Sequence, residues 1–454
     1  MSKVQVKYDI LSVFILILWL SSILGLAFCV GQKDFNWIVT LYIVAFAGYM
    51  YFIFRSDQGL SFTTLIIAAF VARAAAGIAF PGLSDDIYRF VWDGRLYLEG
   101  ISAFEQLPLF YLLEGNQIKG LDQFLFDQLN SQEYFSIYPT VGQWIFAFSA
   151  WIFPESIYGF SVVMKSILSL MDMGSILILI FLLKEIIGSK KRVLLYALNP
   201  LIIIELSGNG HLEAAMIFFL LLSIVLLWKN RIWWSAMAMA AAIASKLLPL
   251  MFLPFLLVLL PWRKVMRYYL FVGMGLVFFA IPFYDLTLLE NLGDSLSLYF
   301  QRFEFNASVY YVIRWVGFQY KGYNIIQSAG PMLGIMVFLS IWILTWWNRN
   351  GYLRNFPTLC LWGMTIYLSL SSLVHPWYIT PMIALCLFSD YRFPILWSFV
   401  IIGSYFNYTY EPFSENLWIV ALEYVLVFGV MIFEIKKFNF TRPALKQKGL
   451  GEGC

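Results

Sequence analysis

The chain has 454 residues, of which 61% are hydrophobic and 13% are charged. Soluble globular proteins have about 45–50% apolar and about 25% charged residues, so this composition excludes a soluble protein and predicts a polytopic membrane protein. The net charge of +3 comes from short basic clusters between apolar runs, a pattern that marks membrane topology rather than a nucleic-acid-binding surface. We therefore expect membrane lipid around the chain and no nucleic acid partner.

Three apolar runs open the chain, each long enough to cross the hydrocarbon core as a helix: 10–30, 36–54 and 60–80. Positively charged residues stay on the cytoplasmic side, and Lys3, Lys7 and Arg55 flank these runs. The third run therefore delivers the acidic stretch after it to the outer face. Residues 81–140 mix aromatic and polar pieces, which suit short helices lying in the membrane interface.

The remaining apolar runs fit between basic clusters, although residues 138–187 leave the number of crossings open. Run 138–153 is barely long enough to cross, and run 157–187 is longer than one crossing needs. The later predicted spans are 192–207, 211–228, 232–247, 249–261, 267–283, 327–347, 356–374, 376–390, 393–410 and 417–435. The total is about 13 or 14 helices.

These assignments predict an all-α, polytopic transmembrane helical bundle that fills residues 1–435 as a single domain. Its outer face carries interfacial helices in the loop 81–140 and a second loop at 284–326. A basic cytoplasmic tail follows at 436–454. On this topology the chain's polar turns gather on the outer side with the acidic stretch.

The acidic stretch contains two adjacent carboxylates, Asp85 and Asp86, directly after Ser84. Neighbouring negative charges repel, so one proton is held more tightly than usual, and such a carboxylate can act as a general base near neutral pH. The same residues also fit the start of a helix, where acids cap the first turn. The sequence leaves both interpretations open.

The rest of the stretch has the periodicity of a helix. Helical spacing sets Asp86, Arg89 and Asp93 along one side, with Tyr88, Trp92 and Arg95 close by on another. Aromatic faces beside charged hydrogen-bonding groups suit a sugar, because the rings stack on its C–H face and the charges bind its hydroxyls. The alternative is interfacial anchoring with surface ion pairs, and for Trp92 alone this alternative is favoured.

His211 and His375 are the two histidines of the chain. A lone histidine is more often a structural hydrogen-bonding group than a catalyst. Both are nevertheless predicted at outer helix ends, within polar or aromatic turns. Asn209 and Glu213 flank His211 and would line the floor of a pocket with it, unless Asn209 simply caps a helix.

Lys246 lies among apolar residues, where an unpaired cation is costly. Pro249 breaks the helix just beyond it, so we expect the ammonium to face an outer cavity and bind an anion such as a lipid phosphate. Snorkelling to the interface is the alternative. Lys165 and Asp172 lie one heptad apart within a predicted helix, and we interpret them as an internal packing pair.

The stretch from Ser84 to Arg95 resembles the first outer loop of membrane-embedded GT-C glycosyltransferases, and most closely that of the bacterial polyprenyl-phosphate-mannose-dependent mannosyltransferases. Further motifs of that group follow in order: Asn199-Pro200 with Glu205, Gly208-Asn209-Gly210-His211-Leu212-Glu213-Ala214, Lys246-Leu247-Leu248-Pro249, and His375-Pro376-Trp377-Tyr378. The chain departs from the group in two places. It reads Ser102-Ala103-Phe104 where Asn-Pro-Tyr is common, and Tyr138-Pro139-Thr140 where Tyr-Pro-Pro is common.

The resemblance implies a hexosyltransferase of the bacterial cytoplasmic membrane, with its active site on the outer face. It would move a sugar, mannose in this group, from a polyprenyl-phosphate donor to an acceptor hydroxyl with inversion. The acceptor would be a glycolipid, a polysaccharide or a protein. No cofactor is expected, and a divalent metal at the two aspartates is the disfavoured alternative.

Matched residue by residue, the resemblance gives each polar group a role. Asp85 would deprotonate the acceptor hydroxyl, with Asp86 as its neighbour or alternate. Lys246 would contact the donor phosphate, and Arg89 or Arg95 could share that role. The residues that would orient sugar or acceptor are His211, Glu213 and His375, and the aromatic Trp377 and Tyr378 complete the substrate-binding set.

Two other classes of protein compete with this interpretation. A transporter or lipid flippase would place its ionisable residues near the middle of the bilayer, often on broken helices in paired halves. Here most of them cluster at outer helix ends, and no halves correspond. A non-catalytic scaffold would leave the apolar surroundings of Lys246 and the placement of both histidines unexplained.

Overall fold

A computed structural model describes residues 9–55, 59–283, 288–410 and 413–438. These residues are helical, and the nearest approach to a sheet among them is one isolated bridge between Phe305 and Leu373. The prediction of an all-α polytopic bundle is therefore confirmed. Most of the predicted cytoplasmic tail, at 439–454, lies outside the described residues, as do residues 284–287 of the second outer loop.

Six helical segments in the described ranges are long and apolar enough to cross a membrane: α1 (Ile10–Phe28), α2 (Phe35–Phe54), α7 (Ile157–Ile186), α13 with η5 (Trp262–Phe283), α16 (Ile326–Trp347) and α20 (Leu417–Phe438). A seventh is possible if Pro200–Gly208 and Glu213–Trp228, which meet at an angle of 111°, form one broken span. Shorter apolar helices accompany them: α3 (Phe62–Ile78), α11 (Ile232–Ser245) and the pair η4 (Leu248–Phe252) and α12 (Leu253–Leu259).

Fewer segments pass this length test than the 13 or 14 helices that the sequence predicts, because proline divides several predicted spans. Proline fixes its own φ and lacks an N–H group, so it begins helices and ends those before it. Predicted spans 192–207, 249–261, 376–390 and 393–410 accordingly appear as short pieces: η2 (Lys190–Val193), α8 (Leu194–Ala197), α9 (Pro200–Ile202), η3 (Ile203–Gly208), η4, α12, η7 (Pro376–Ile379), α18 (Thr380–Cys386), α19 (Phe393–Val400) and η8 (Ile401–Thr409).

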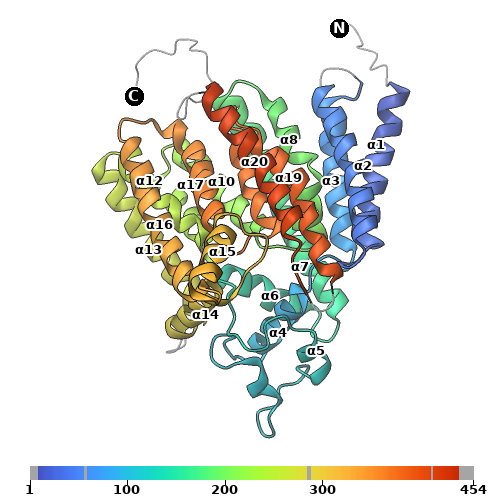
Figure 1. Cartoon of the computed structure of the whole chain (residues 1–454), viewed down its shortest axis with the longest axis vertical. Coiled ribbons are helices and arrows are strands. Elements are labelled where there is room, and N and C mark those ends of the chain that lie inside the picture. The colour runs from blue at the N-terminus through green and yellow to red at the C-terminus, as the bar shows by residue number, and fades with distance from the viewer. Residues whose placement is uncertain (1–8, 56–58, 284–287, 411–412, 439–454) are drawn as a thin grey trace.

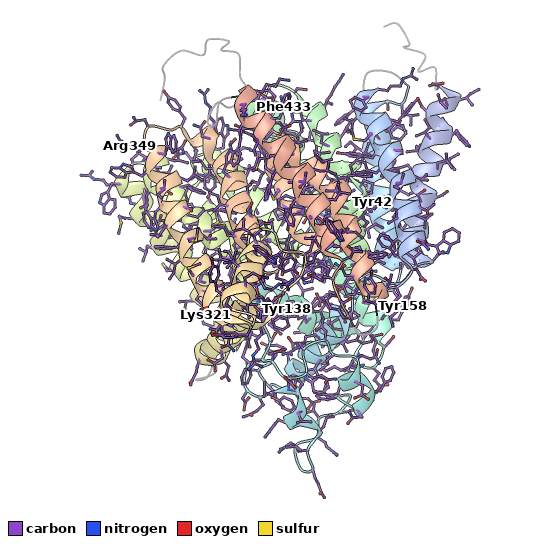
Figure 2. All side chains as sticks on the ribbon, in the orientation of Figure 1. Tyr42, Tyr138, Tyr158, Lys321, Arg349 and Phe433 are labelled. Atoms are coloured by element: carbon purple, nitrogen blue, oxygen red, sulfur yellow. The ribbon has the colours of Figure 1, made fainter. Side chains whose placement is uncertain are left out.

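The loop 81–140 forms a cap at one end of the bundle. Figure 1 shows α4 (Asp86–Leu98) and α5 (Gln123–Asp127) beyond the lower ends of the long helices, whereas α1 begins and α20 ends at the upper end. Tyr138 and Lys321 lie toward the cap, opposite Arg349 and Phe433 (Figure 2). The other described elements are η1 (Pro108–Leu112), α6 (Thr140–Ile152), α10 (Glu213–Trp228), α14 (Leu288–Arg302), α15 (Val309–Lys321), η6 (Leu353–Asn355) and α17 (Phe356–Leu370).

The two predicted helices of region 138–187 have the unequal lengths that the sequence indicates. Helix α6 has 13 residues and α7 has 30. The short helix packs against both α4 and α7, so it connects the cap to the bundle. This contact holds α4 next to the lower ends of the long helices in Figure 1.

The buried charges of α7 do not pair with each other. Asp172 accepts hydrogen bonds from Arg73 Nε at 2.6 Å and from the Tyr196 hydroxyl at 2.6 Å. Lys165 instead donates to the carbonyls of Ala79 and Gly208, the latter at 2.7 Å. The predicted packing pair of Lys165 and Asp172 is thus wrong, because each residue finds its partner on a different segment.

Candidate active site

A cavity of about 390 Å³ lies where the cap meets the bundle. Seven of the residues singled out from the sequence line it: Asp86, His211, Glu213, Lys246, His375, Trp377 and Tyr378. They come from four separate segments of the chain. The rest of the lining is mostly apolar and aromatic: Phe90, Ile137, Tyr138, Pro139, Leu212, Ser245, Leu247, Leu248, Leu250, Met251 and Tyr367.

The carboxylate pair stands at the first turn of α4. Asp85 is the N-cap residue by backbone position, yet its side chain makes no capping hydrogen bond, and the Asp86 N–H donates to Ser84 Oγ at 3.3 Å instead. The helix N-terminus favours the negative charge of both aspartates. Because Ser84 takes the capping contact, both carboxylates remain available to other groups.

Asn130 connects the two carboxylates. Its Nδ2 donates to Asp85 Oδ1 at 3.0 Å and to Asp86 Oδ1 at 2.8 Å. Asp85 is exposed and is not in the cavity lining. Desolvation by the surrounding protein, together with the charge of Asp86, raises its pKa to about 6, against the lowering effect of Asn130. Asp85 therefore takes up a proton as the pH falls through about 6.

Arg89 and Asp93 form a buried ion pair that faces the cap rather than the cavity. Arg89 Nε donates to Asp93 Oδ1 at 2.8 Å, and the two side chains are 2% and 0% exposed. The guanidinium also binds the carbonyls of Ser131 and Tyr134, while Asp93 accepts from Gln143 at 3.0 Å. This network fixes the segment that carries Asn130, one residue before Ser131.

The other predicted residues of α4 are also absent from the cavity lining. Arg95 donates to three backbone carbonyls, among them Gly120 at 2.6 Å and Pro154 at 2.9 Å. Trp92 is buried, with its ring 6.1 Å from that of Phe126. Tyr88 is half-buried at the start of the helix. The substrate contacts expected of these side chains and of Arg89 and Asp93 remain predictions that this arrangement does not support.

His211 is held by Glu205 at the end of a π-helical turn. Its Nδ1 lies 3.0 Å from the Glu205 carbonyl oxygen and 3.2 Å from Glu205 Oε2. Gly210 has φ +80°, and a Cβ there would approach Lys165 Cγ within 2.9 Å, so the turn before His211 requires glycine. Asn209, which does not line the cavity, donates to Glu205 Oε2 at 3.1 Å and accepts from the Leu83 N–H at 3.3 Å.

The remaining nitrogen of His211 points toward the carboxylate pair. Nε2 lies 3.9 Å from Asp86 Oδ2. It is buried and has no hydrogen-bond partner among the described residues. Glu205, which the sequence only hinted at, is fully buried and also accepts from the Tyr405 hydroxyl at 2.8 Å.

Lys246 forms an ion pair with Glu213 in the lining of the cavity. Lys246 follows the last residue of α11, and Glu213 is the first residue of α10. The ammonium lies 4.3 Å from the centre of the Tyr378 ring and the side chain is 26% exposed, whereas Glu213 is 1% exposed. An ammonium has three donors, so Lys246 can hold Glu213 and still bind an anion in the cavity.

Four aromatic rings form a stack along the cavity wall. The centre of the Trp377 ring lies 3.8 Å from that of His211 and 4.3 Å from that of His375, with interplanar angles of 18° and 7°. Two parallel rings at such distances must occupy opposite faces of the indole. Phe305 stacks on His375 at 4.7 Å. Both faces of Trp377 are therefore covered, and a sugar would meet only its edge.

His375 is half-buried and lies between Phe305 and Trp377 in this stack. Burial lowers its pKa to about 3, with the charges of His211 and Lys246 acting in the same direction, so the ring is neutral at physiological pH. Two backbone hydrogen bonds fix Phe305 to the segment just before His375. The Phe305 N–H donates to the Ser372 carbonyl at 3.0 Å, and the Phe305 carbonyl accepts from the Val374 N–H at 2.8 Å. The second outer loop is thereby tied to the site.

The described residues contain no group of three or more His, Cys, Asp and Glu side chains that could hold a metal ion. At the place considered for a divalent cation, the amide of Asn130 lies between Asp85 and Asp86. Sequence reasoning missed Asn130, Tyr138 and Phe305 as parts of the site. None of them is part of a sequence motif with a spacing typical of a functional site. Tyr138 does lie in Tyr138-Pro139-Thr140, one of the two places where the chain departs from the group's motifs.

Comparison with known proteins gives one match. Residues 37–262, just under half of the chain, match the family model MptA_B, described as Alpha-(1->6)-mannopyranosyltransferase, N-terminal domain. No curated protein matches the chain. The matched range contains Asp85, Asp86, His211, Glu213 and Lys246. The predicted resemblance to membrane-embedded mannosyltransferases is confirmed, because residues 37–262 are similar to the N-terminal domain of the alpha-(1->6)-mannopyranosyltransferases.

Proposed function

We propose that this protein transfers a mannosyl group from a polyprenyl-phosphate donor to an acceptor hydroxyl, with inversion, on the outer face of the bacterial cytoplasmic membrane. The family match supports the mannosyltransferase activity. The observation that carries the finer proposal is the composition of the cavity. The carboxylate of Asp86 and the ion pair of Lys246 with Glu213 line it, and most of the other lining side chains are apolar or aromatic.

The apolar part of the cavity suits a lipid chain. Leu247, Leu248 and Met251 line it beside Lys246, and Leu250, which is 43% exposed, brings this lining to the molecular surface. A prenyl chain could lie along these side chains while its phosphate meets the ammonium. Apolar burial and charge pairing would then act on adjacent parts of one donor.

The polar groups suit a one-base displacement. Asp85, with Asp86 as its neighbour or alternate, would remove the proton of the acceptor hydroxyl as that oxygen attacks the anomeric carbon. The bond to phosphate breaks on the opposite side, and the departing phosphate needs countercharge rather than a general acid. Lys246 supplies that charge, and Glu213 keeps the ammonium at the cavity wall.

The acceptor would enter from the side of the cap. Asp85, which directly precedes α4 of the cap, is exposed. A glycolipid, a polysaccharide or a protein could present its hydroxyl at this position. Attack from the carboxylate side, with phosphate leaving toward Lys246, accounts for inversion of the anomeric configuration.

The direct experiment measures transfer of labelled mannose from polyprenyl phosphate to an alkyl mannoside by the purified full-length protein. We expect a mannosylated product whose anomeric configuration, read by NMR, is opposite to that of the donor. Replacing Asp85 and Asp86 together by Asn should abolish transfer, whereas Glu114→Gln, an exposed carboxylate of the cap, should not. Full activity of the double variant would refute the assignment.

The competing hypothesis of a transporter or flippase makes a different prediction in the same preparation. Reconstituted into vesicles, such a protein would move the labelled donor lipid between leaflets and form no glycosidic bond. If the donor lipid moved between leaflets and no mannosylated product formed, the transferase proposal would be wrong. Product formation in detergent, where no leaflets exist, would support it.

A further inference from the structure

We infer that His211 and Glu205 form a proton relay behind the carboxylate pair, in which Asp86 passes the acceptor's proton to Nε2 of His211. This inference rests on the proposed transferase function and deepens it. It gives a task to a buried histidine nitrogen that has no hydrogen-bond partner among the described residues. It also identifies Asp86 as the residue through which the proton leaves the pair.

The contacts of Nδ1 fix the tautomer of His211. Both atoms that approach Nδ1 are acceptors, since they are the carbonyl and carboxylate oxygens of Glu205 at 3.0 and 3.2 Å. Nδ1 must therefore carry a hydrogen. In a neutral imidazole the other nitrogen then has a free lone pair. Glu205 thus prepares Nε2 of His211 to accept a proton.

The other ring nitrogen of His211 points toward Asp86. Nε2 faces Asp86 Oδ2 at 3.9 Å, slightly beyond hydrogen-bond range. Leaving a buried acceptor without a partner destabilises the folded protein, so an unpaired nitrogen that faces a carboxylate calls for an explanation. A protonated Asp86 would close the gap, because its O–H would find an acceptor directly in front of it.

The neighbours of His211 would stabilise the charged ring that results. Glu205 is fully buried and is fixed by hydrogen bonds from Tyr405 at 2.8 Å and Asn209 at 3.1 Å. A buried carboxylate in contact with Nδ1 stabilises an imidazolium. The Trp377 face, stacked at 3.8 Å, holds the plane of the ring in place. The groups that would stabilise the imidazolium are therefore already in place around the ring, and only the gap to Asp86 has to close.

The proton balance closes without another reagent. The acceptor O–H bond breaks and its proton moves to the carboxylate pair. The acceptor oxygen forms the new bond to the anomeric carbon, while the old bond to phosphate breaks and leaves its electron pair on phosphate. Asp86 then gives the proton to His211 Nε2. The imidazolium releases it to the phosphate monoester or to water as products leave, which restores all three side chains.

Charged and titratable groups surround His211 on several sides. Asp85 and Asp86 face it from α4, and Glu205 from η3. His375 lies on the far face of Trp377 and is neutral, with its pKa lowered to about 3. The ion pair of Lys246 and Glu213 lines the same cavity. Among these, Asp86 and Glu205 contact the two ring nitrogens of His211.

The test uses His211→Gln and Glu205→Gln in the full-length protein, with polyprenyl-phosphate mannose and an alkyl mannoside as substrates. We expect kcat to fall about 10- to 100-fold in each variant, with the donor KM within about 2-fold of its original value. Rates in mixtures of H2O and D2O should curve with deuterium content in the wild type, because more than one proton is in flight. They should become linear in both variants.

His375→Gln serves as the matched control. The His375 ring stacks on the other face of Trp377 but faces no carboxylate. The transfer rate of this variant can therefore change, but its rate should still depend on deuterium content along a curve, as in the wild type. A second readout is the double variant Asp86→Asn with His211→Gln, which should be no slower than Asp86→Asn alone, since the relay acts only through Asp86. Thermal unfolding curves of each variant separate loss of folding from loss of the relay.

The outcomes distinguish the relay from the transferase proposal. If the wild type makes no mannoside, the proposed function fails and the relay fails with it. If the wild type is active while folded His211→Gln keeps its kcat and the curved isotope response, the relay alone is overturned. Multiplicative losses in the double variant would also overturn it, because they would show that His211 acts independently of Asp86.

Discussion

The two halves of α4 carry the same kinds of charge but use them differently. Asp85 and Asp86, at its start, share one amide donor at the cavity and keep their outer oxygens open. Arg89, Asp93 and Arg95, one to two turns later, are buried and direct their charges into ion pairs and backbone carbonyls of the cap. The mechanism proposed above assigns the chemistry to the first turn, and the contacts of the following turns hold that turn in place.

The later charges of α4 are held in a buried ion pair and in contacts with backbone carbonyls, whereas its first two carboxylates share a single amide donor. A buried ion pair contributes little net stability yet is costly to break. The buried half of α4 therefore supports the exposed half through the segment that carries Asn130. The following predictions test the division, beginning with the largest expected effect.

The double substitution Asp85→Asn with Asp86→Asn should lower the rate of mannosyl transfer by about 10³-fold or more, because a positioned base contributes about 10²–10⁴-fold. Folding should be retained, since neither side chain caps the helix. Transfer rate and thermal unfolding measured on one preparation check both parts. If the double variant were destabilised as much as Asp93→Asn, the first turn of α4 would be as important for folding as the later turns, which would contradict the division.

Asp93→Asn should lower the free energy of unfolding by about 3–5 kcal/mol, because it leaves the Arg89 guanidinium buried without its countercharge. Thermal unfolding in detergent measures this effect, and Asp127→Asn, an exposed cap residue, is the control. Molecules that remain folded at low temperature should still transfer mannose. A variant as stable as the wild type but inactive would instead place Asp93 in the chemistry.

Lys246→Met should raise the donor KM by about 10-fold or more, because the phosphate loses its cation and Glu213 remains buried without a partner. Lys246→Arg should recover part of the affinity, since it keeps the charge. Initial rates at varied donor concentration measure the change. An unaltered donor KM together with a raised acceptor KM would show that the ammonium of Lys246 contacts the acceptor and not the donor.

Asn130→Ala should shift the pH dependence of transfer. The wild type should lose activity as the pH falls through about 6, where Asp85 takes up a proton. Asn130 lowers the pKa of Asp85 by donating to its carboxylate, so its removal should raise that pKa and move the acid limb to higher pH. Profiles of kcat/KM measure the shift, with Asn116→Ala as control. A shift to lower pH would contradict the role of Asn130.

The sequence predicts which distant motifs lie close together better than it predicts which side chains form ion pairs or hydrogen bonds. The positive-inside rule places the turns of His211, Lys246 and His375 on one side of the membrane, and the structure gathers all three around one cavity. Helical periodicity could not show that Arg89 turns into the cap. It also could not show that Asp172 finds Arg73 on another helix, because such contacts depend on tertiary packing.

The length of the helices was the less predictable part of the fold. Hydrophobic runs report burial in lipid or protein alike, so proline-divided runs such as 376–390 look like crossings although the structure forms them from short pieces. Tyr138 and Phe305 reach the site from loops. Loop geometry depends on backbone contacts, such as the pairing of Phe305 with Ser372 and Val374, which leave no periodic signal.

The aromatic stack also has a consequence for the timing of catalysis. A continuous stack of rings connects the loop at 284–326 with the carboxylate pair, in the order Phe305, His375, Trp377 and His211. Closely packed rings cannot shift one by one. Movement of the loop at Phe305 and tilting of His211 are therefore not independent events, and a substrate that displaces the loop on entry would also reset the aim of the histidine before the reaction begins.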